Sequence, residues 1–559
     1  MTSESSHTVD SNRALTIRSL VIGALGSAVL TASSLFIALR LGALPWPIVF
    51  AALASVGALR LMGGHNLHEA NVCHAAMSAG SMVAGGLAFT IPGLWMLGGA
   101  DVSLVQVLAA SLAGTVLGLA ACAMLQPYFI REQRLAYPIG VSAAETLRAT
   151  SDTGGKGGRL LFGGMGFSAI YALLRDVFGI LPQYLGLTTA VPGVTLGIYN
   201  SPMMLSMGFM IGVVPALVWF GGTLVGSLLI GAGLPALGVC TIEEAAALRQ
   251  CLGLGLMFGV GAGIVVKGLL PVVKRLASSE KTVPGTESDA GERMRRLHAS
   301  RSFVGVSAAV AAAIAATLLG LGLLPSVILV AGSWFCVYLS GWLTGTTGVN
   351  PMELFGVMVL LLLQVLFHQV TTASLFLAAA VVAVACGIGG DVMNDLKAGD
   401  ELGTDPHDQF MGMVVGGLVG AVVAACMLMV LKTTYGADQF GGNGMFVAAQ
   451  ASVVATMAGG IPNVPAFVVG VIAGAAGAIA GLPIMTLGLG VYLPFTTSSG
   501  VIVGALVRLA VDRRAKDKTP EERARVNAGG QTLASGFLGG ESLVGVITAL
   551  ILMFGMLAS

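Results

Sequence analysis

Long stretches of this chain carry no charged side chain, and short polar segments separate them. Residues 302–352 and 409–431, for example, contain no Asp, Glu, Lys or Arg. A helix that crosses the hydrocarbon core of a bilayer needs about 20 mostly apolar residues. Counted on that basis, the apolar stretches predict an all-α, polytopic membrane bundle of about 14 to 17 transmembrane or re-entrant segments.

Two uncharged intervals are long enough to hold more than one helix each. The interval 177–242 has room for two helices, and 439–507 has room for two or three. Within the second interval, the Gly- and Pro-rich segment 457–465 predicts a broken or re-entrant helix. Non-helical backbone at membrane depth persists only where it is buried in protein or faces water.

The N-terminal end predicts a retained spanning helix. Residues 1–13 form a polar tail, and Arg18 precedes the uncharged stretch 19–39. That stretch is longer than the apolar region of a secretory signal and lacks a small-residue cleavage site. We therefore interpret it as the first transmembrane helix.

Three longer hydrophilic segments are rich in Arg and Lys and predict the orientation in the membrane: 131–159, 271–301 and 508–528. The positive-inside rule places them, together with the N-terminus, on the cytoplasmic side of a cell (inner or plasma) membrane. After the tail at 1–13, we therefore expect a first membrane half at 14–270, a cytoplasmic linker at 271–301 and a second membrane half at 302–559.

The two halves contain segments of similar sequence. Residues 76–95 and 449–467 are both rich in small residues and have a Gly-Gly pair ahead of a proline, and residues 137–148 resemble 493–508. The order is the same in both halves, which predicts an internal repeat. Transporters are often built from such repeats, with the substrate at the repeat interface.

The composition agrees with a membrane protein. Of the residues, 55% are hydrophobic and only 10% are charged, whereas soluble proteins carry about 25% charged residues. The net charge of +1 gives no overall field to attract nucleic acid. The seven cysteines form no Cys-x-x-Cys pair, so we expect core residues and no disulfide framework.

The segment 387–399, GIGGDVMNDLKAG, places charges directly after an apolar stretch and opens a cluster of six carboxylates within Asp391–Asp408. Charges at the end of a membrane segment are costly unless they are solvated, paired or functional. If 388–398 is helical, Asp391 and Asp395 are i,i+4 neighbours on one face. Neighbouring carboxylates in a dehydrated site hold a proton more readily, as a proton-coupled carrier requires.

Asn394 and Lys397 of the same segment are i,i+3 neighbours and are further candidates for substrate binding. The alternative is structural: Asp391 caps the helix, while Asp395 and Lys397 anchor it at the membrane interface. The remaining polar residues of the cluster are expected in a hydrated loop: Asp400, Glu401, Asp405, His407 and Asp408.

Asn350 and Glu353 flank Pro351 at a predicted helix start between two apolar spans. A carboxylate in the first turn suits the helix dipole, so capping competes with function for Glu353. A cavity for zwitterionic or anionic solutes such as peptides and chelates needs carboxylates, cationic groups or helix N-termini, and amides. The segments Asn350–Glu353 and Asp391–Lys397 supply these groups.

Three further candidates are less specific. Tyr137 opens a helix through Tyr137-Pro138, and Glu145 of that helix is i,i+3 to Arg148, a spacing that also suits a simple surface pair. Glu541 follows Gly539-Gly540 and is the charged residue of an apolar final helix, so both a functional and a structural role stay open.

Histidines and methionines add weaker signals. His368 lies in an apolar stretch that we expect to be helical, where it is either a hydrogen-bonded core residue or a proton relay. A helix entrance carries His65, His68, His74 and Glu69, but this position favours an interfacial role, and we expect no metal site. Four methionines within 203–210 are expected to be packing residues.

These motifs together resemble the oligopeptide transporter family, which includes the yellow-stripe-like metal-chelate transporters. GGDVMNDLKAG is similar to the family's Gly-Asp-x-x-Gln-Asp-Leu-Lys-x-Gly signature, with Asn394 where Gln is common. LAYPIGVSAAETLRA is similar to its Leu-Pro-Tyr-Pro-x-Gly…Ala-Glu-Val-Leu-Arg stretch, with Ile139 and Gly140 replacing a more polar pair. VYLPFTTSSGVIVGALVR and GGESLVGV also resemble it, so the likeness runs from about residue 14 to 557.

The chain departs from the fungal and plant peptide branch, whose Asn-Pro-Gly and Lys-Ile-Pro-Pro-Arg motifs it lacks. This favours the compact prokaryotic branch and leaves the substrate open. The resemblance implies a secondary active symporter, usually proton-coupled, that imports small peptides or peptide-like metal chelates by alternating access. It implies no cofactor beyond a coupling proton, and it leaves the oligomeric state open, with a homodimer among the alternatives.

Two other classes compete with a carrier. An intramembrane metalloprotease needs His-Glu-x-x-His, and a serine enzyme needs a Gly-x-Ser-x-Gly type of site; neither pattern is present in a suitable context. A passive channel has no need of carboxylates placed to hold a proton. We therefore expect a transporter and not an enzyme.

Overall fold

The computed structural model describes residues 14–41, 48–63, 66–98, 101–152, 156–191, 194–278, 301–347, 350–441 and 444–558. The predicted tail at 1–13 and most of the predicted linker lie outside these residues. Helix α11 extends to Ser278 and α13 begins at Arg301, so residues 271–278 of the predicted linker are helical.

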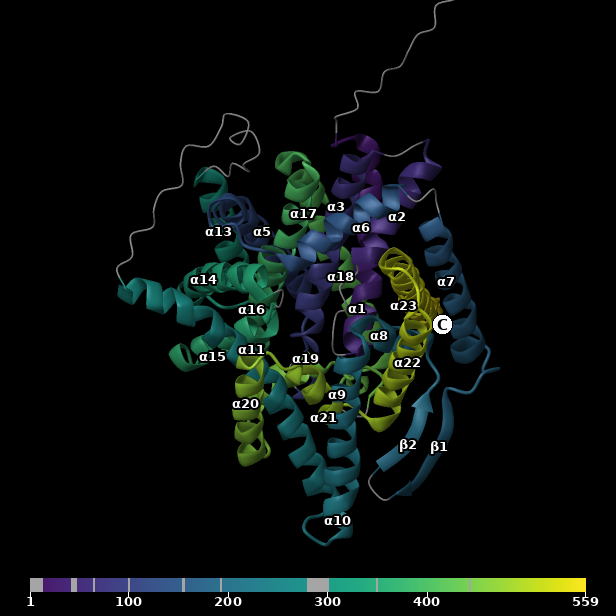
Figure 1. The fold of residues 1–559 in the computed structure, drawn as a ribbon. Coiled ribbons are helices and arrows are strands. Elements are labelled where there is room, and N and C mark those ends of the chain that lie inside the picture. Colours follow the sequence, from purple (N-terminus) through teal and green to yellow (C-terminus); the bar gives the residue numbers. More distant parts are fainter. Residues whose placement is uncertain are drawn as a thin grey trace, which may run out of the picture.

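Helices dominate the described part of the chain (Figure 1). Those before the predicted linker are α1 (Ile17–Leu41), α2 (Ile48–Leu61), α3 (Leu67–Ala88), α4 (Pro92–Met96), α5 (Leu104–Gln126), α6 (Pro138–Asp152), α7 (Lys156–Ala172), α8 (Pro202–Ile211), α9 (Val213–Thr223), α10 (Leu234–Ala236) and α11 (Ile242–Ser278). Three π-helical segments continue helices of this half: η1 (Pro127–Glu132), η2 (Leu173–Val177) and η3 (Leu224–Gly233).

The second half of the chain is also mainly helical. Its helices are α13 (Arg301–Thr317), α14 (Leu323–Thr347), α15 (Met352–Leu366), α16 (Thr372–Cys386), α17 (Met393–Leu402), α18 (Pro406–Tyr435), α19 (Ala449–Gly459), α20 (Val464–Ile479), α21 (Ile484–Tyr492), α22 (Phe495–Arg514) and α23 (Pro520–Ala558). The π-helical segment η4 (Gly387–Asp391) joins α16 to α17, and the 3₁₀ turn η5 (Ala437–Gln439) follows α18.

Within the described residues, ten helices are long and apolar enough to span a membrane, and four shorter apolar helices accompany them. The prediction of a polytopic helical membrane protein is therefore confirmed. All seven cysteines are free thiols. Met203, Met204 and Met207 are buried in the core, as expected for packing residues.

One element was not predicted. The strands β1 (Tyr184–Val191) and β2 (Val194–Tyr199) pair antiparallel, with Tyr184 opposite Tyr199, and take up part of the interval expected to hold two helices. Tyr, Thr, Val and Leu in these segments favour a strand, and apolar content alone does not separate a strand from a helix. The hairpin lies at the lower right of Figure 1, where β2 contacts α22.

Buried apolar residues form three clusters, and the two larger ones define helix groups that do not follow the sequence halves. The smaller third cluster joins α2 and α6 to α1, α3 and α17. The first helix group takes its buried residues chiefly from α1, α3 and α5 and from α14 to α18. The second helix group takes them chiefly from α8, α9, α11, α21 and α22. Each group thus combines helices from before and after the linker, and residues distant in sequence become neighbours.

Glycine allows helices within the first helix group to approach closely. A Cβ on Gly416 or Gly420 of α18 would collide with the backbone of Ala76 or Gly80 of α3. Because lipid gives no hydrophobic drive for helix association, such close packing is a main source of stability between membrane helices.

The similar segments 76–95 and 449–467 contact each other in the structure. Helix α19 ends at Gly459 and α20 begins at Val464, which confirms the predicted break in 457–465. A similar break separates α3 from α4, and α4 packs on α19 with Gly93 against the backbone of Ala451.

Candidate functional site: a charged cavity and a buried acidic core

A cavity of about 980 Å³ lies between the two helix groups. Helices α1 and α18 of the first group line one side, while η2, the hairpin, α8, α22 and α23 line the other. Its charged lining residues are Arg40, Arg175, Asp176 and Glu541. Among the sequence-predicted candidates, Glu541 is the one that lines this cavity.

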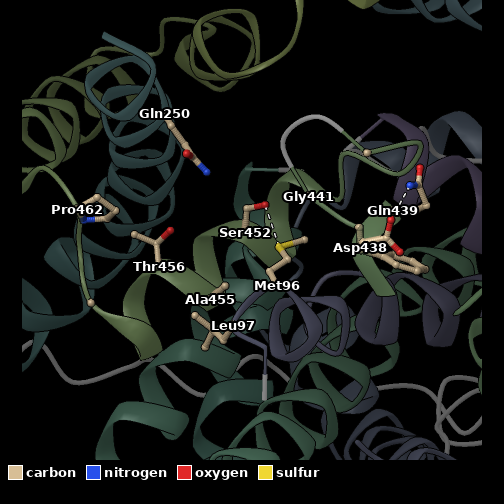
Figure 2. Close-up of a pocket in the computed structure, with 13 residues that line it drawn as sticks. Met96, Leu97, Gln250, Asp438, Gln439, Gly441, Ser452, Ala455, Thr456 and Pro462 are labelled. Carbon is tan, nitrogen blue, oxygen red and sulfur yellow. Dashed lines mark hydrogen bonds between the residues drawn. The ribbon is translucent and has the colours of Figure 1, made fainter. Parts of the chain in front are cut away.

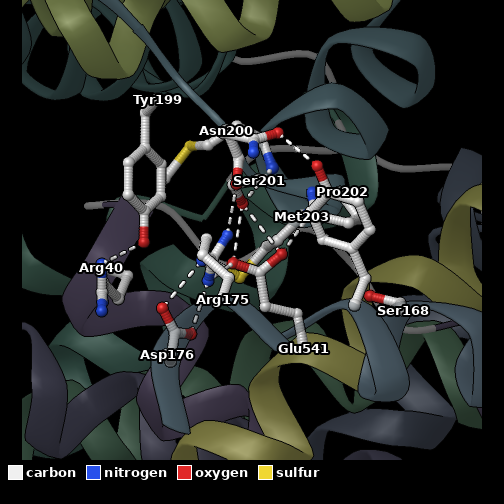
Figure 3. A network of polar contacts seen from close by, with 12 residues as sticks. Arg40, Ser168, Arg175, Asp176, Tyr199, Asn200, Ser201, Pro202, Met203 and Glu541 are labelled. Carbon is white, nitrogen blue, oxygen red and sulfur yellow. Dashed lines mark hydrogen bonds and ion pairs between the residues drawn. The ribbon is translucent and has the colours of Figure 1, made fainter. Parts of the chain in front are cut away.

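Glu541 is held at the cavity wall by three kinds of donor (Figure 3). Its carboxylate accepts hydrogen bonds from Arg175 at 2.8 Å, from the Ser201 hydroxyl at 2.8 and 2.9 Å, and from the Met203 backbone N–H at 2.9 Å. Ser201 is the N-cap of α8, and Met203 lies in its first turn. A negative charge at this position is stabilised by the free N–H groups and by the helix dipole.

Arg175 connects two carboxylates. Besides Glu541, it donates to both oxygens of Asp176 at 2.6 and 2.7 Å and to the Asn200 carbonyl at 2.6 Å. Its guanidinium also lies 5.1 Å from the centroid of the Tyr199 ring. One cation therefore serves two anions, and this cluster of three residues carries a net charge of −1.

Arg40 reaches the same cavity from the last turn of α1. It donates to the Tyr199 hydroxyl at 2.9 Å. Its guanidinium lies 5.5 Å from the Phe36 ring and 5.8 Å from the Tyr199 ring, within the range of cation–π attraction.

A second cavity of about 520 Å³ adjoins the first (Figure 2). Gln439 and Gly444 line both cavities, so the two cavities share part of their walls. The polar side chains of the second cavity are Gln250, Asp438, Gln439, Ser452 and Thr456.

Asp391 lies in a separate, buried region at the end of η4. Asn350 donates to its carboxylate at 2.9 Å and to the Cys386 carbonyl at 2.9 Å, and Ser340 donates to the Asn350 side-chain oxygen at 2.8 Å. Glu353 lies in the first turn of α15, as predicted, and acts electrostatically on Asp391. The structure thus brings the segment Asn350–Glu353 into contact with the segment Asp391–Lys397.

The shared face expected for Asp391 and Asp395 depended on a continuous α-helix over 388–398, and the structure does not meet this condition. Residues 387–391 are π-helical, and α17 begins only at Met393, so the register changes between the two carboxylates. Asp395 instead faces α3, where His74 Nδ1 lies 3.7 Å from its carboxylate and both side chains are fully buried. The glycines of η4 permit this geometry, since Gly389 packs tightly on Val337.

Asn394 and Tyr137 join helices around this region. Asn394 donates to the Asp391 carbonyl at 3.0 Å and accepts from the Gly140 N–H at 3.2 Å, which fixes the start of α6 against α17. The Tyr137 hydroxyl donates to the Gly341 carbonyl at 2.8 Å. We call Asn350, Glu353, Asp391, Asn394 and Asp395 the acidic core; none of them lines either cavity.

Lys397 and its neighbours form a half-buried cluster of charges, of which Glu401 is exposed. Lys397 pairs with Glu401 at 2.8 Å and with Asp400 at 3.6 Å, and Arg131 also pairs with Asp400. The prediction of a hydrated loop is wrong for Asp400 and Glu401, because α17 continues to Leu402.

The prediction is also wrong for His407 and Asp408, which lie in the first turn of α18, whereas Asp405 lies just before this helix. Asp405 is exposed and caps α18 by accepting from the His407 N–H at 2.8 Å. Asp408 accepts from the backbone N–H of Leu15 at 3.2 Å, which places this segment beside the start of α1.

Two candidates lie away from both regions. Glu145 is exposed on α6, and its neighbour Arg148 donates to the Glu401 carbonyl. The expectation of a helical His368 is wrong: α15 ends at Leu366, and His368 is exposed in the turn before α16. A histidine suits such a turn because its polar ring stays hydrated.

Around the predicted histidine cluster, Glu69 pairs with Arg18, and the His68 ring lies 3.1 Å from the Thr404 hydroxyl. His65 lies outside the described residues. In the part of the chain that the structure covers, no group of three or more His, Cys, Asp or Glu is placed to hold a metal ion.

Sequence reasoning missed Arg40, Arg175, Asp176 and Tyr199. A signal was available, because Arg175 and Asp176 interrupt an apolar stretch, and ionisable residues inside spanning segments are rarely without a role. Tyr199 gave no signal of its own, since it reaches the cavity through the unpredicted hairpin.

A polytopic helical bundle with a charged cavity between two groups of membrane helices is the architecture expected of an integral membrane transporter. The sequence matches the family described as OPT oligopeptide transporter protein over residues 14–238 and 259–552. The chain therefore belongs to the OPT oligopeptide transporter family, which is a family of transporters and not of enzymes.

A curated relative agrees with this family. The chain is similar to a Haemophilus influenzae protein named "Putative oligopeptide transporter", with 24% identity over 93% of this chain and 92% of that protein. The likeness extends over nearly the full length of both proteins. The residues that match the family include those of the Glu541 site and of the acidic core.

Proposed function

We propose that this protein imports small peptides by proton-coupled symport. In this proposal the peptide occupies the cavity between the two helix groups, and the acidic core carries the coupling proton. The observation that carries the proposal is the cavity of about 980 Å³ with two arginines and two carboxylates in its wall. Peptides are zwitterions, and charges of both signs suit their two ends.

The position of the cavity supports alternating access. Its wall is shared between the two helix groups, so a movement of one group against the other opens or closes it. Carriers built from repeats work in this way, with the substrate near the repeat interface. The contact between α4 and α19 lies beside the second cavity, where Met96 and Ser452 are in contact at 3.3 Å.

The acidic core is suited to hold a proton and not a solute. Asp391 and Asp395 are buried, and Asp391 acts electrostatically on Asp395. A buried carboxylate is far less costly when protonated, because the neutral form avoids the desolvation of a charge. A carrier whose carboxylates gain and lose a proton as they are exposed in turn to each side of the membrane couples transport to the proton gradient.

We propose that the N-terminus faces the cytoplasm, as the Arg- and Lys-rich segments indicate. The bond from Leu15 to Asp408 then puts the exit of segment 391–408 on the cytoplasmic side as well. Protons would reach the acidic core through a path that opens toward the outside.

Peptide-like metal chelates are a second candidate substrate. Met204 and Met445 line the cavity, and thioether sulfur is a soft ligand that tolerates a transition-metal complex. A copper complex of triglycine that competes with trialanine for uptake would favour this broader specificity.

Uptake by proteoliposomes tests the proposal. Purified protein is reconstituted into liposomes, and uptake of radiolabelled trialanine is followed with the outside more acidic than the inside. Coupled symport predicts accumulation above the external concentration and its loss when a protonophore collapses the gradient. Equal uptake with and without the gradient would show a channel or a uniporter, and hydrolysis of the peptide would show an enzyme.

A further inference from the structure

Among the described residues, Arg40 and Arg249 are half-buried cations to which the structure gives no anionic partner, and of these two only Arg40 lines the cavity between the two helix groups. Among the described residues, no carboxylate lies within 4.0 Å of its guanidinium, whereas Arg175, Arg18 and Lys432 each have one. Its Nε is buried and makes no hydrogen bond within the described residues. Its one polar bond is to the Tyr199 hydroxyl at 2.9 Å.

Tyr199 does not neutralise Arg40. Burial in the cavity wall raises the pKa of the Tyr199 phenol above its ordinary value, so this side chain stays protonated and neutral. Phe36 and Tyr199 contribute the faces of their rings, which hold the guanidinium in place without cancelling its charge.

The two carboxylates of the cavity are already engaged. Asp176 and Glu541 both bind Arg175, and they act on Arg40 only through the longer-range field. Counting Arg175, Asp176 and Glu541 as one cluster of net charge −1, Arg40 remains the separate positive site of this wall. A cation kept beside a cavity without a partner is costly unless an anion visits it.

We propose that Arg40 binds the terminal carboxylate of the transported peptide, an inference that rests on the proposed function. A guanidinium presents a planar fork of N–H donors that matches a carboxylate in two parallel hydrogen bonds. The Phe36 and Tyr199 rings leave the guanidinium aimed into the cavity between the two helix groups. A bound peptide then completes the charge pairing that the protein alone leaves unfinished.

The test compares trialanine with trialanine amide, which lacks the terminal charge. Binding of each is measured by calorimetry on the purified full chain in lipid nanodiscs, for the wild type and for Arg40→Gln. We expect the wild type to bind the free acid at least about tenfold more tightly than the amide. In Arg40→Gln the affinity for the free acid falls to that for the amide, which changes little.

Two further variants keep the test decisive. Arg40→Lys retains the charge without the planar fork, and it should keep part of the preference for the free acid even if Arg40→Gln folds poorly. Lys432→Gln is the matched control, because Lys432 also lies over an aromatic ring, that of Trp95, but pairs with Asp101. This variant should keep the wild-type preference.

The outcomes separate this inference from the proposed function. A wild type that accumulates trialanine but binds acid and amide equally would overturn the role of Arg40 and leave symport intact. A wild type that prefers the free acid through Arg40 but accumulates no peptide would support the binding site and overturn symport. Retention of the preference in Arg40→Gln, or no binding of trialanine by the wild type, would also overturn the inference.

Discussion

The cluster of Arg175, Asp176 and Glu541, called here the Glu541 cluster, and the acidic core both contain buried carboxylates, yet they differ in what surrounds them. Glu541 faces a cavity of about 980 Å³ and shares Arg175 with Asp176. Asp391 and Asp395 are enclosed by helices and face Asn350 and His74. The first region has room for a solute and has fixed ion pairs, while the second has neither. We infer that solute binding and proton binding are divided between them.

The largest effect on stability is expected for a substitution of Arg175 in the cavity wall. Arg175→Met leaves Glu541 and Asp176 without their cation, and loss of one partner of a buried ion pair costs about 3–5 kcal/mol of stability. Thermal unfolding in detergent should show a large fall in the melting temperature. The matched control is Arg508→Met, because Arg508 pairs with the partly exposed Asp512 near the end of α22. An equal fall in melting temperature in the two variants would show that Arg175 contributes no more to stability than Arg508.

Asp391→Asn should separate the acidic core from the cavity. The amide keeps the shape of the carboxylate and can still accept from Asn350, so we expect a folded protein with normal peptide binding. It cannot exchange a proton, so gradient-driven accumulation of trialanine should fall by at least about tenfold, the effect that general proton-transfer groups commonly have. The control is Asp405→Asn, an exposed cap that Asn also suits. Glu353→Gln should behave like Asp391→Asn, and normal uptake in both variants would remove the acidic core from the mechanism.

Gly140→Ala tests how tightly the acidic core is closed. A Cβ at Gly140 would collide with the Asn394 carbonyl and approach the Lys397 Cβ at 3.0 Å, so α6 must move away from α17. Overpacking of this kind costs about 1–3 kcal/mol. Gly163→Ala on α7 is the control, because nothing lies within 4 Å of its added methyl group and alanine favours a helix. If Gly140→Ala is as stable as Gly163→Ala, helices α6 and α17 are not closely packed at this position.

The smallest effect is expected outside both regions. Lys397→Gln removes partly exposed pairs with Glu401 and Asp400, and such pairs contribute about 0–1 kcal/mol. Glu145→Gln changes an exposed side chain. Uptake of trialanine should stay within about twofold of the wild type in both variants, a range typical of surface sites. A strong loss of trialanine uptake in either variant would indicate that these residues take part in transport.

Much of the acidic core could be predicted from sequence because its signals are local. Asp391, Asp395 and Glu353 stand at the ends of apolar stretches, where a charge is conspicuous, and the signature around 387–399 resembles a known family. Their mutual geometry could not be predicted, since the π-helical turn of η4 depends on how its glycines pack against α14.

The cavity was beyond sequence reasoning for a different physical reason. Its wall joins Arg40 near the start of the chain to Glu541 near its end, and the hairpin that carries Tyr199 lies in an interval that reads as helix. The two helix groups cross the boundary between the sequence halves, so no local pattern reveals which charges meet. Glu541 was a candidate only because it is the single charge in a long apolar stretch.

The most direct test of the divided roles is peptide counterflow in Asp391→Asn. Proteoliposomes are loaded with unlabelled trialanine, and the entry of labelled trialanine is measured without a proton gradient and then with one. The account predicts that exchange persists at close to the wild-type rate, while the gradient no longer drives accumulation. Loss of exchange and of driven uptake in equal proportion, with the protein folded, would show that Asp391 binds the solute and would contradict the division.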